Sequence, residues 1–168
     1  MPSVQNNFKE TFVGHLLNWI QGQKSLSIQF DITNACNLSC RHCYHSNHRN
    51  VGALSFEEWQ IVLGQYEAMR KKLRLRPAFV LCGGEPLANR NWRDYIEKIR
   101  AIHPDAPIRI LTNGTLIDTE SARFLYEKKC NVQISLDGPT ADLHDQVRGK
   151  GNFERTLTGV RRLREAGV

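Results

Sequence analysis

The stretch LSIQFDITNACNLSCRHCY, residues 26–44, joins a predicted strand to a loop crowded with cysteines. Residues 26–32 alternate apolar and polar side chains, which is typical of a β-strand. From Thr33 to about Ala53 the sequence is polar and rich in cysteine and histidine, which predicts a loop. The cysteines therefore follow the carboxyl end of a strand.

The rest of the chain repeats this layout. Strands are predicted at residues 78–82, 108–112 and 132–136, and helices at 55–73, 91–102, 118–128 and 153–165. Ser55 and Glu58 have the spacing of a capping box. The other expected caps are Asn91, Asp118, Asn152 and, at the C-terminal end, Gly167. Regular alternation of strands and helices predicts an α/β fold with parallel strands.

Each predicted strand ends in a loop rich in Gly, Asn, Asp, Cys or Glu. In parallel α/β folds, ligands bind at the carboxyl ends of the strands. We therefore expect a single site on one rim of the sheet. Its expected segments are residues 36–44, 83–86, 112–114 and 135–138.

Cys36, Cys40 and Cys43 form a C-x-x-x-C-x-x-C pattern. This spacing lets one loop wrap three thiolates around a small inorganic core. In a [4Fe–4S] cluster each iron needs a ligand, so three cysteines leave one iron open. An open position marks a catalytic centre rather than a structural one.

A zinc site is the competing interpretation of the same loop, because His42, His45 and His48 lie close to the cysteines. A Cys₃His zinc site is tetrahedral and closed. The loop by itself leaves both alternatives open, and the histidines also suit the surface on composition grounds.

Bulk properties narrow the class of protein. With 168 residues and 40% hydrophobic content, the chain suits one domain with a real core. The net charge of +6 comes from basic runs at helix ends, which favours solvated helix faces over nucleic-acid binding. No apolar run could span a membrane, no signal peptide is evident and the five cysteines do not suggest a disulfide framework. These features predict a cytoplasmic protein without a membrane partner.

The motifs as a set resemble the radical S-adenosylmethionine (SAM) superfamily. The resemblance covers roughly residues 26–168 and is carried by CNLSCRHCY (36–44), GGEP (83–86), LTNGT (111–115), ISLDGP (134–139), His144-Asp145, Arg148-Gly149 and Phe153-Glu154-Arg155. It implies a partial TIM-like (βα) barrel in which four of the usual six strand–helix units are present. Residues 1–24 would then be a helical extension, and residues 25–168 the N-terminal portion of the core, cut before the fifth strand.

The resemblance also implies a chemistry. A [4Fe–4S] cluster reductively cleaves SAM to a 5′-deoxyadenosyl radical, which abstracts hydrogen from a substrate. The implied cluster ligands are Cys36, Cys40 and Cys43. Tyr44 would lie at the adenine, and Gly83, Gly84 and Glu85 would receive the methionyl amino group. Ser135 would face the SAM carboxylate or ribose, Arg155 would pair with the carboxylate, and Asn113 and Asp137 would complete the rim.

The SLDGP, HD, RG and FER elements resemble the sulfatase-maturase and SPASM-type branch, which modifies peptides. A peptide or protein substrate and an electron donor such as flavodoxin or ferredoxin are implied. The chain as given is expected to be a poorly active enzyme. Two alternatives stay open: a Cys-rich metal-binding or electron-transfer module without SAM chemistry, and an inactive fragment. The sequence does not name the substrate or the bond that is modified.

Overall fold

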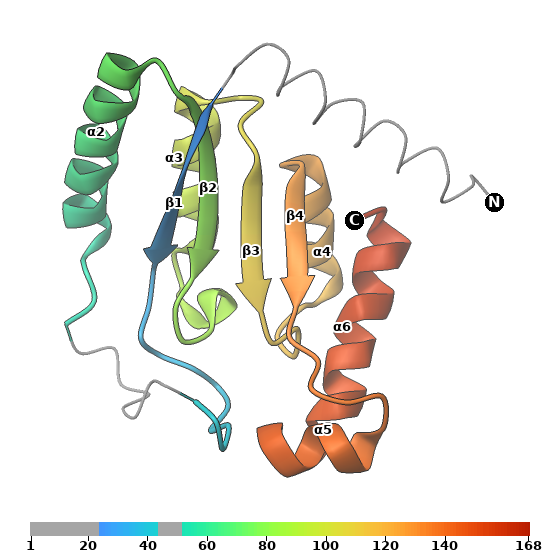
Figure 1. The fold of residues 1–168 in the computed structure, drawn as a ribbon. Helices are drawn as coiled ribbons and strands as arrows, with labels where there is room; N and C mark the ends of the chain where they lie inside the picture. Colours follow the sequence, from blue (N-terminus) through green and yellow to red (C-terminus); the bar gives the residue numbers. More distant parts are fainter. Residues whose placement is uncertain (1–23, 44–51) are drawn as a thin grey trace.

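The computed structural model describes residues 24–43 and 52–168. One parallel sheet has its strands in the order β1-β2-β3-β4, so each strand lies beside its neighbour in the sequence. The strands are β1 Ser25–Asp31, β2 Arg76–Cys82, β3 Ile108–Thr112 and β4 Cys130–Ile134. The helices are α2 Phe56–Leu73, η1 Pro86–Ala88, α3 Trp92–Ile102, α4 Thr119–Glu127, α5 Ala141–Arg148 and α6 Asn152–Ala166. The predicted parallel α/β architecture is confirmed (Figure 1).

Three of the four expected residues stand at the N-cap of a helix, and two of these three make the side-chain bond of a cap. Ser55 and Glu58 form the expected capping box, with Glu58 N–H donating to Ser55 Oγ over 3.1 Å. Asp118 Oδ1 accepts from Ser121 N–H at 2.7 Å. Asn91 makes no side-chain cap bond, and Asn152 is the first residue of α6 rather than its cap, which is Gly151.

Other element boundaries differ in part from the prediction. β4 begins two residues earlier than predicted, at the buried Cys130, and Gly167 ends α6 as expected with φ of +95°. Helix α5 was not predicted; its sequence ADLHDQVR is mostly polar, and His144 is its one buried residue. The helix expected within residues 1–24 lies outside the described residues, apart from Lys24. Among the described residues, no helix is long and apolar enough to cross a membrane.

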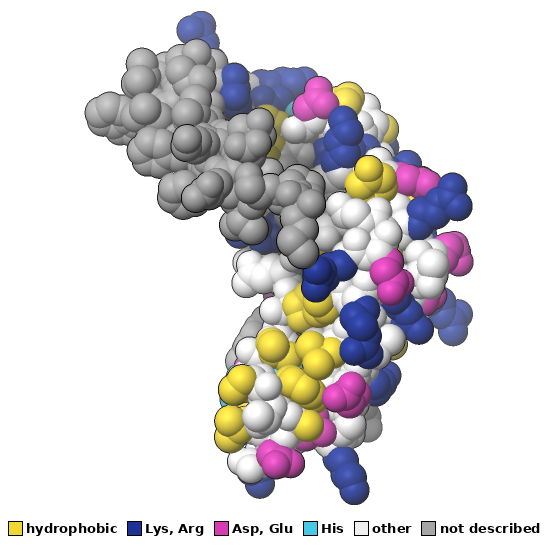
Figure 2. Space-filling view, turned by 90° about the vertical axis from the view of Figure 1, so that its right-hand side faces the viewer, with side chains coloured by type: hydrophobic (Ala, Val, Ile, Leu, Met, Phe, Trp, Pro, Cys, Tyr) yellow, Lys and Arg dark blue, Asp and Glu magenta, His cyan; other side chains and the backbone are white. Residues whose placement is uncertain are grey.

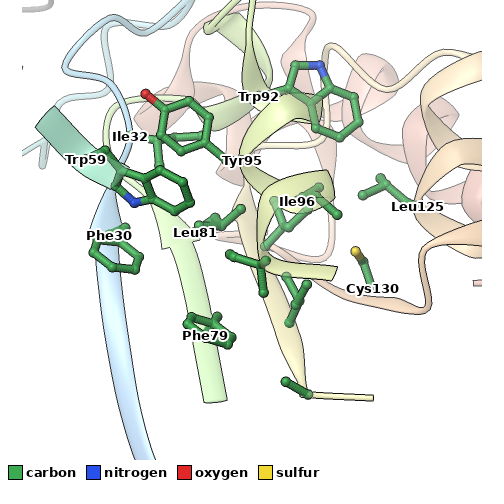
Figure 3. Packing of buried hydrophobic residues seen from close by; sticks show 14 of the residues in the cluster. Phe30, Ile32, Trp59, Phe79, Leu81, Trp92, Tyr95, Ile96, Leu125 and Cys130 are labelled. Atoms are coloured by element: carbon green, nitrogen blue, oxygen red, sulfur yellow. The ribbon is translucent and has the colours of Figure 1, made fainter. Parts of the chain in front are cut away.

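The core lies between the sheet and its helices. Phe79, Ile108 and Ile110 are at most 1% exposed and face Ile96 and Ile99 of α3, which are fully buried. Figure 3 shows Phe30, Trp59 and Tyr95 packed where β1 meets α2 and α3; the Trp59 and Tyr95 ring centroids are 4.7 Å apart. This packing fixes the strand ends, and so the loops that follow them.

The opposite face of the sheet is polar on β1 and β4, with Val80 of β2 and Leu111 of β3 between them. Gln29 and Asp31 of β1, Arg109 of β3, and Asn131 and Gln133 of β4 are all exposed there. Within the described residues β4 pairs only with β3, so it forms one edge of the sheet. Figure 2 views the molecule from the side of this edge. Hydrophobic side chains gather in the lower part of that view.

A buried ion pair joins α2 to the end of α3, away from the cysteines. Glu67 is 9% exposed. Its Oε2 accepts a hydrogen bond from Arg70 Nη2 at 2.9 Å, and its Oε1 lies 2.7 Å from His103 Nε2. Burial opposes ionisation, but the bonds with Arg70 and His103 outweigh it and lower the pKa of Glu67 from its ordinary 4.5. The ionised carboxylate therefore stabilises the fold above its unfolded pKa, and this contribution is lost as the pH falls through the folded pKa.

We expect Glu67→Gln to lower the free energy of unfolding at pH 7 by about 2–3 kcal/mol, because a charged hydrogen-bonding group is lost from a buried pair. Urea unfolding at pH 7 and at acid pH measures this. Glu57→Gln, an exposed change on the same helix, serves as the control and should stay within about 0.5 kcal/mol. A Glu67→Gln deficit that is as large at pH 3 as at pH 7 would contradict this role.

Candidate functional site

The three clustered cysteines converge on one pocket. Cys36, Cys40 and Cys43 lie in the loop that follows β1, at the carboxyl edge of the sheet (Figure 1). All three are free thiols and line a pocket of about 240 Å³. Other segments of the predicted rim line it too, at Gly83, Gly84, Asn113 and Ser135. The rim is therefore brought together as the strand pattern predicts.

The loop is ordered by its own backbone around the sulfurs. Leu38 N–H donates to Cys36 Sγ at 3.4 Å, and Cys43 N–H donates to the Cys40 carbonyl at 3.1 Å. Leu38 is 6% exposed, so the side chain in the middle of the loop is buried. An N–H group aimed at Cys36 stabilises negative charge on that sulfur.

The Gly83–Gly84 turn supports the stem of this loop. Gly84 N–H donates to the Thr33 carbonyl and Glu85 N–H to the Ala35 carbonyl, both at 2.8 Å. A Cβ on Gly83 would lie 2.2 Å from Thr33 O, and one on Gly84 would lie 2.4 Å from Ala35 O. The two glycines are thus required where two backbones touch, in addition to lining the pocket.

The Glu85 carboxylate has a different place from the one expected. It is 1% exposed and accepts from Thr112 Oγ1 at 2.6 Å, Asn113 N–H at 2.8 Å and Leu87 N–H at 3.1 Å. Burial raises its pKa despite these bonds. The carboxylate thus ties the turn after β2 to the end of β3, whereas the backbone of the Gly83–Gly84 turn lines the pocket.

An amide pair links the cysteine loop to β3. Asn113 Nδ2 donates to Asn37 Oδ1 at 2.9 Å, and Asn37 Nδ2 donates to Thr115 Oγ1 at 2.8 Å. Asn113 Oδ1 accepts from the Thr115 N–H at 2.9 Å. Asn37, between Cys36 and Cys40, was missed by the sequence reasoning. Its only signal was its place inside the cysteine motif.

The loop after β4 and the end of α5 together bring a cation to the pocket. Ser135 lines the pocket, and its N–H donates to the Thr112 carbonyl at 3.0 Å. Asp137 pairs with Arg148, which also lines the pocket and whose Nη1 lies 4.0 Å from Cys40 Sγ. Burial opposes ionisation of Asp137, but Arg148 outweighs it and lowers the pKa of that carboxyl.

Arg155 was expected at the SAM carboxylate, but the structure does not bring it to the pocket. It is exposed, and its Nη1 donates to Asn152 Oδ1 at 3.1 Å. Arg148 is the guanidinium that lines the pocket. The sequence did contain a signal for Arg148, since Arg148-Gly149 is one of the motifs that resemble the superfamily. Tyr44, expected at the adenine, lies outside the described residues.

Helix α5 docks on the cysteine loop. Arg41 N–H donates to the Val147 carbonyl at 2.9 Å. His144 of the same helix is fully buried and its Nδ1 accepts from Asp137 N–H at 3.3 Å. Burial, with the nearby Arg148 charge, lowers the pKa of His144, which suits a neutral ring that accepts a bond. α5 therefore fixes the loop after β4 and the cysteine loop together.

A family model named Radical SAM superfamily matches residues 30–168, which is most of the chain and includes the whole rim. The chain belongs to the radical SAM superfamily. Members are enzymes that use a [4Fe–4S] cluster and SAM, so the cofactors that the motifs imply are confirmed at the level of the family.

Two curated relatives illustrate the range of this superfamily. The chain is 34% identical over 145 residues to the mycofactocin maturase MftC of Mycobacterium ulcerans, covering 84% of this chain and 37% of that protein. It is 35% identical over 147 residues to the AdoMet-dependent heme synthase of Methanosarcina barkeri, covering 83% and 39%. The chain thus spans well under half the length of these relatives.

A solved structure of the same superfamily, anSMEcpe with bound AdoMet and the Cp18Cys peptide, resembles the fold closely. The TM-score is 0.67 at 26% sequence identity, over 87% of this chain and 41% of that chain. The partial TIM-like arrangement of parallel strands with outer helices agrees with this likeness.

The thiols of this radical SAM chain fit an iron–sulfur cluster. Burial raises the pKa of Cys36 and of Cys40, and a bound cationic metal would favour the thiolate form of both. Burial and the Asp31 carboxylate raise the pKa of Cys82 to about 12, and its S–H donates to Asp31 Oδ1 at 2.8 Å. Cys82 lines the pocket but stays protonated, unlike a ligand.

A single zinc ion would need its ligands gathered around one point. Within residues 24–43 and 52–168, no group of three His, Cys, Asp or Glu residues could hold one metal ion. A cluster offers each thiolate its own iron, so the three sulfurs need not converge on one point. His42 is exposed and lines the pocket, while His45 and His48 lie outside the described residues.

Proposed function

We propose that residues 25–168 form the N-terminal portion of a radical SAM core, preceded by the extension 1–24. Cys36, Cys40 and Cys43 would hold a [4Fe–4S] cluster with one iron open to SAM. The observation that carries this proposal is the meeting of three free thiols and the Gly83–Gly84 backbone in one pocket. With both cofactors bound, the site would supply a 5′-deoxyadenosyl radical for hydrogen abstraction.

The chain's own residues would position SAM. The Gly83–Gly84 edge would receive the methionyl ammonium, because the glycines leave backbone carbonyls uncovered there. Glu85 would act from behind, by holding that edge to β3. Ser135 would face the carboxylate or ribose, with Asn113 on the same rim and Tyr44 at the adenine. Asp137 would act through its ion pair with Arg148.

We further propose a peptide or protein residue as the substrate. The support comes from anSMEcpe, whose structure holds a peptide, and from a subtilosin biosynthesis protein, AlbA of Bacillus subtilis, among the relatives. A small reducing protein such as flavodoxin or ferredoxin would supply the electron. Five free thiols suit a reducing compartment such as the cytoplasm.

Anaerobic reconstitution with iron and sulfide tests the cofactor assignment. We expect a brown protein with about four irons per chain, whose reduced electron paramagnetic resonance (EPR) signal changes on adding SAM. Dithionite should then release 5′-deoxyadenosine, measured by chromatography. A colourless protein that holds one zinc ion would overturn the proposal in favour of a metal-binding module.

The substrate class needs its own experiment. Peptides encoded by genes next to this one should increase 5′-deoxyadenosine release and change mass in the same reaction. Because one relative is a heme synthase, tetrapyrrole precursors are the matched comparison. Turnover of a tetrapyrrole without turnover of any peptide would contradict the peptide assignment.

A further inference from the structure

Arg148 is the one Arg or Lys among the described residues that line the pocket. It is the last residue of α5, and its side chain is 12% exposed. Its Nη1 donates toward Cys40 Sγ at 4.0 Å. A cation this close to a thiol in a poorly solvated place acts on it much more strongly than a surface charge does.

The guanidinium is held in this position from the opposite side. Its Nε and Nη2 donate to the two carboxylate oxygens of Asp137, the second at 3.4 Å. The Asp137 backbone is held in turn by the buried His144. Since two-point pairing fixes the plane of a guanidinium, the remaining Nη1 is left to point at Cys40.

We propose that Arg148 is a positioning residue that raises the reduction potential of the cluster, through its charge and its N–H···S bond at Cys40. This rests on the proposed function, since it requires the cluster. One-electron reduction adds a negative charge to the cluster. A fixed positive charge and a hydrogen bond to a ligand sulfur favour the reduced state, and both are recognised influences on iron–sulfur potentials.

The test is an EPR-monitored redox titration of the reconstituted chain without SAM. Arg148→Gln is expected to disfavour reduction about tenfold, which moves the midpoint about 59 mV more negative for one electron. Arg148→Lys keeps the charge and should recover part of the shift. Arg161→Gln removes an equal charge from the exposed side of α6 and should leave the midpoint unchanged.

Iron content is measured on every variant to separate the outcomes. If Arg148→Gln holds too little iron to titrate, Arg148→Lys provides the measurement: it keeps the charge but loses the fixed N–H···S bond, and should move the midpoint negative by less than about 59 mV. An unchanged midpoint in the variant that titrates, or equal shifts in Arg148→Gln and Arg161→Gln, would overturn the inference. A wild-type chain that takes up no cluster would instead overturn the proposed function.

Discussion

The Cys40→Ala variant is expected to lose the cluster, with iron and sulfide content at background and no 5′-deoxyadenosine formed. Three thiolates hold the cluster in this proposal, and removing one leaves a second iron without a protein ligand. Cys36→Ala and Cys43→Ala should behave alike, since all three thiols line the same pocket. Iron and sulfide assays with the absorbance spectrum after anaerobic reconstitution measure the effect.

Cys82→Ala is the matched control, because Cys82 lines the same pocket and is also a free thiol. Its pKa of about 12 and its bond to Asp31 assign it to the protonated, non-ligating form. We expect this variant to retain the cluster. Loss of iron as complete as in Cys40→Ala would show that the ligand set is wrong.

Local patterns were enough to predict the sheet and its rim. Alternating residues marked β1 because one of its faces is polar, with Gln29 and Asp31 exposed and Phe30 buried. Parallel order then placed four loops on one edge without any knowledge of distances. Helix α5 was missed because it has only eight residues and its one buried side chain is the polar His144.

The individual roles at the rim were harder to predict, because they depend on contacts between segments far apart in sequence. Arg148 and Arg155 are both in family-like motifs, and only the pairing of Arg148 with Asp137 shows which one reaches the pocket. In the same way, the sequence suggests that the Glu85 carboxylate is free to bind a ligand, whereas in the structure it accepts hydrogen bonds from Thr112 and Asn113. The spacing of residues in the sequence does not reveal either of these contacts.

The Gly83→Ala variant is expected to lose cluster binding through the loop stem rather than through the thiols. Gly83 has φ of +127°, and its new Cβ would lie 2.2 Å from the Thr33 carbonyl oxygen. Backbone strain of about 1–3 kcal/mol adds to overpacking of about 1–3 kcal/mol. We therefore expect the unfolding free energy to fall by about 2–6 kcal/mol, with iron content falling as well.

Gly64→Ala is the matched control for this prediction, because Gly64 lies within α2 and a Cβ there would meet nothing within 4 Å. Alanine at this helical position should stabilise the chain by about 0.5–1 kcal/mol. Urea unfolding and iron assays on both variants separate two explanations of the Gly-Gly pair. If the glycines serve only SAM, Gly83→Ala would keep its stability and cluster and lose SAM binding alone. If they support the cysteine loop, as the Thr33 and Ala35 contacts indicate, stability and iron fall together before SAM is added.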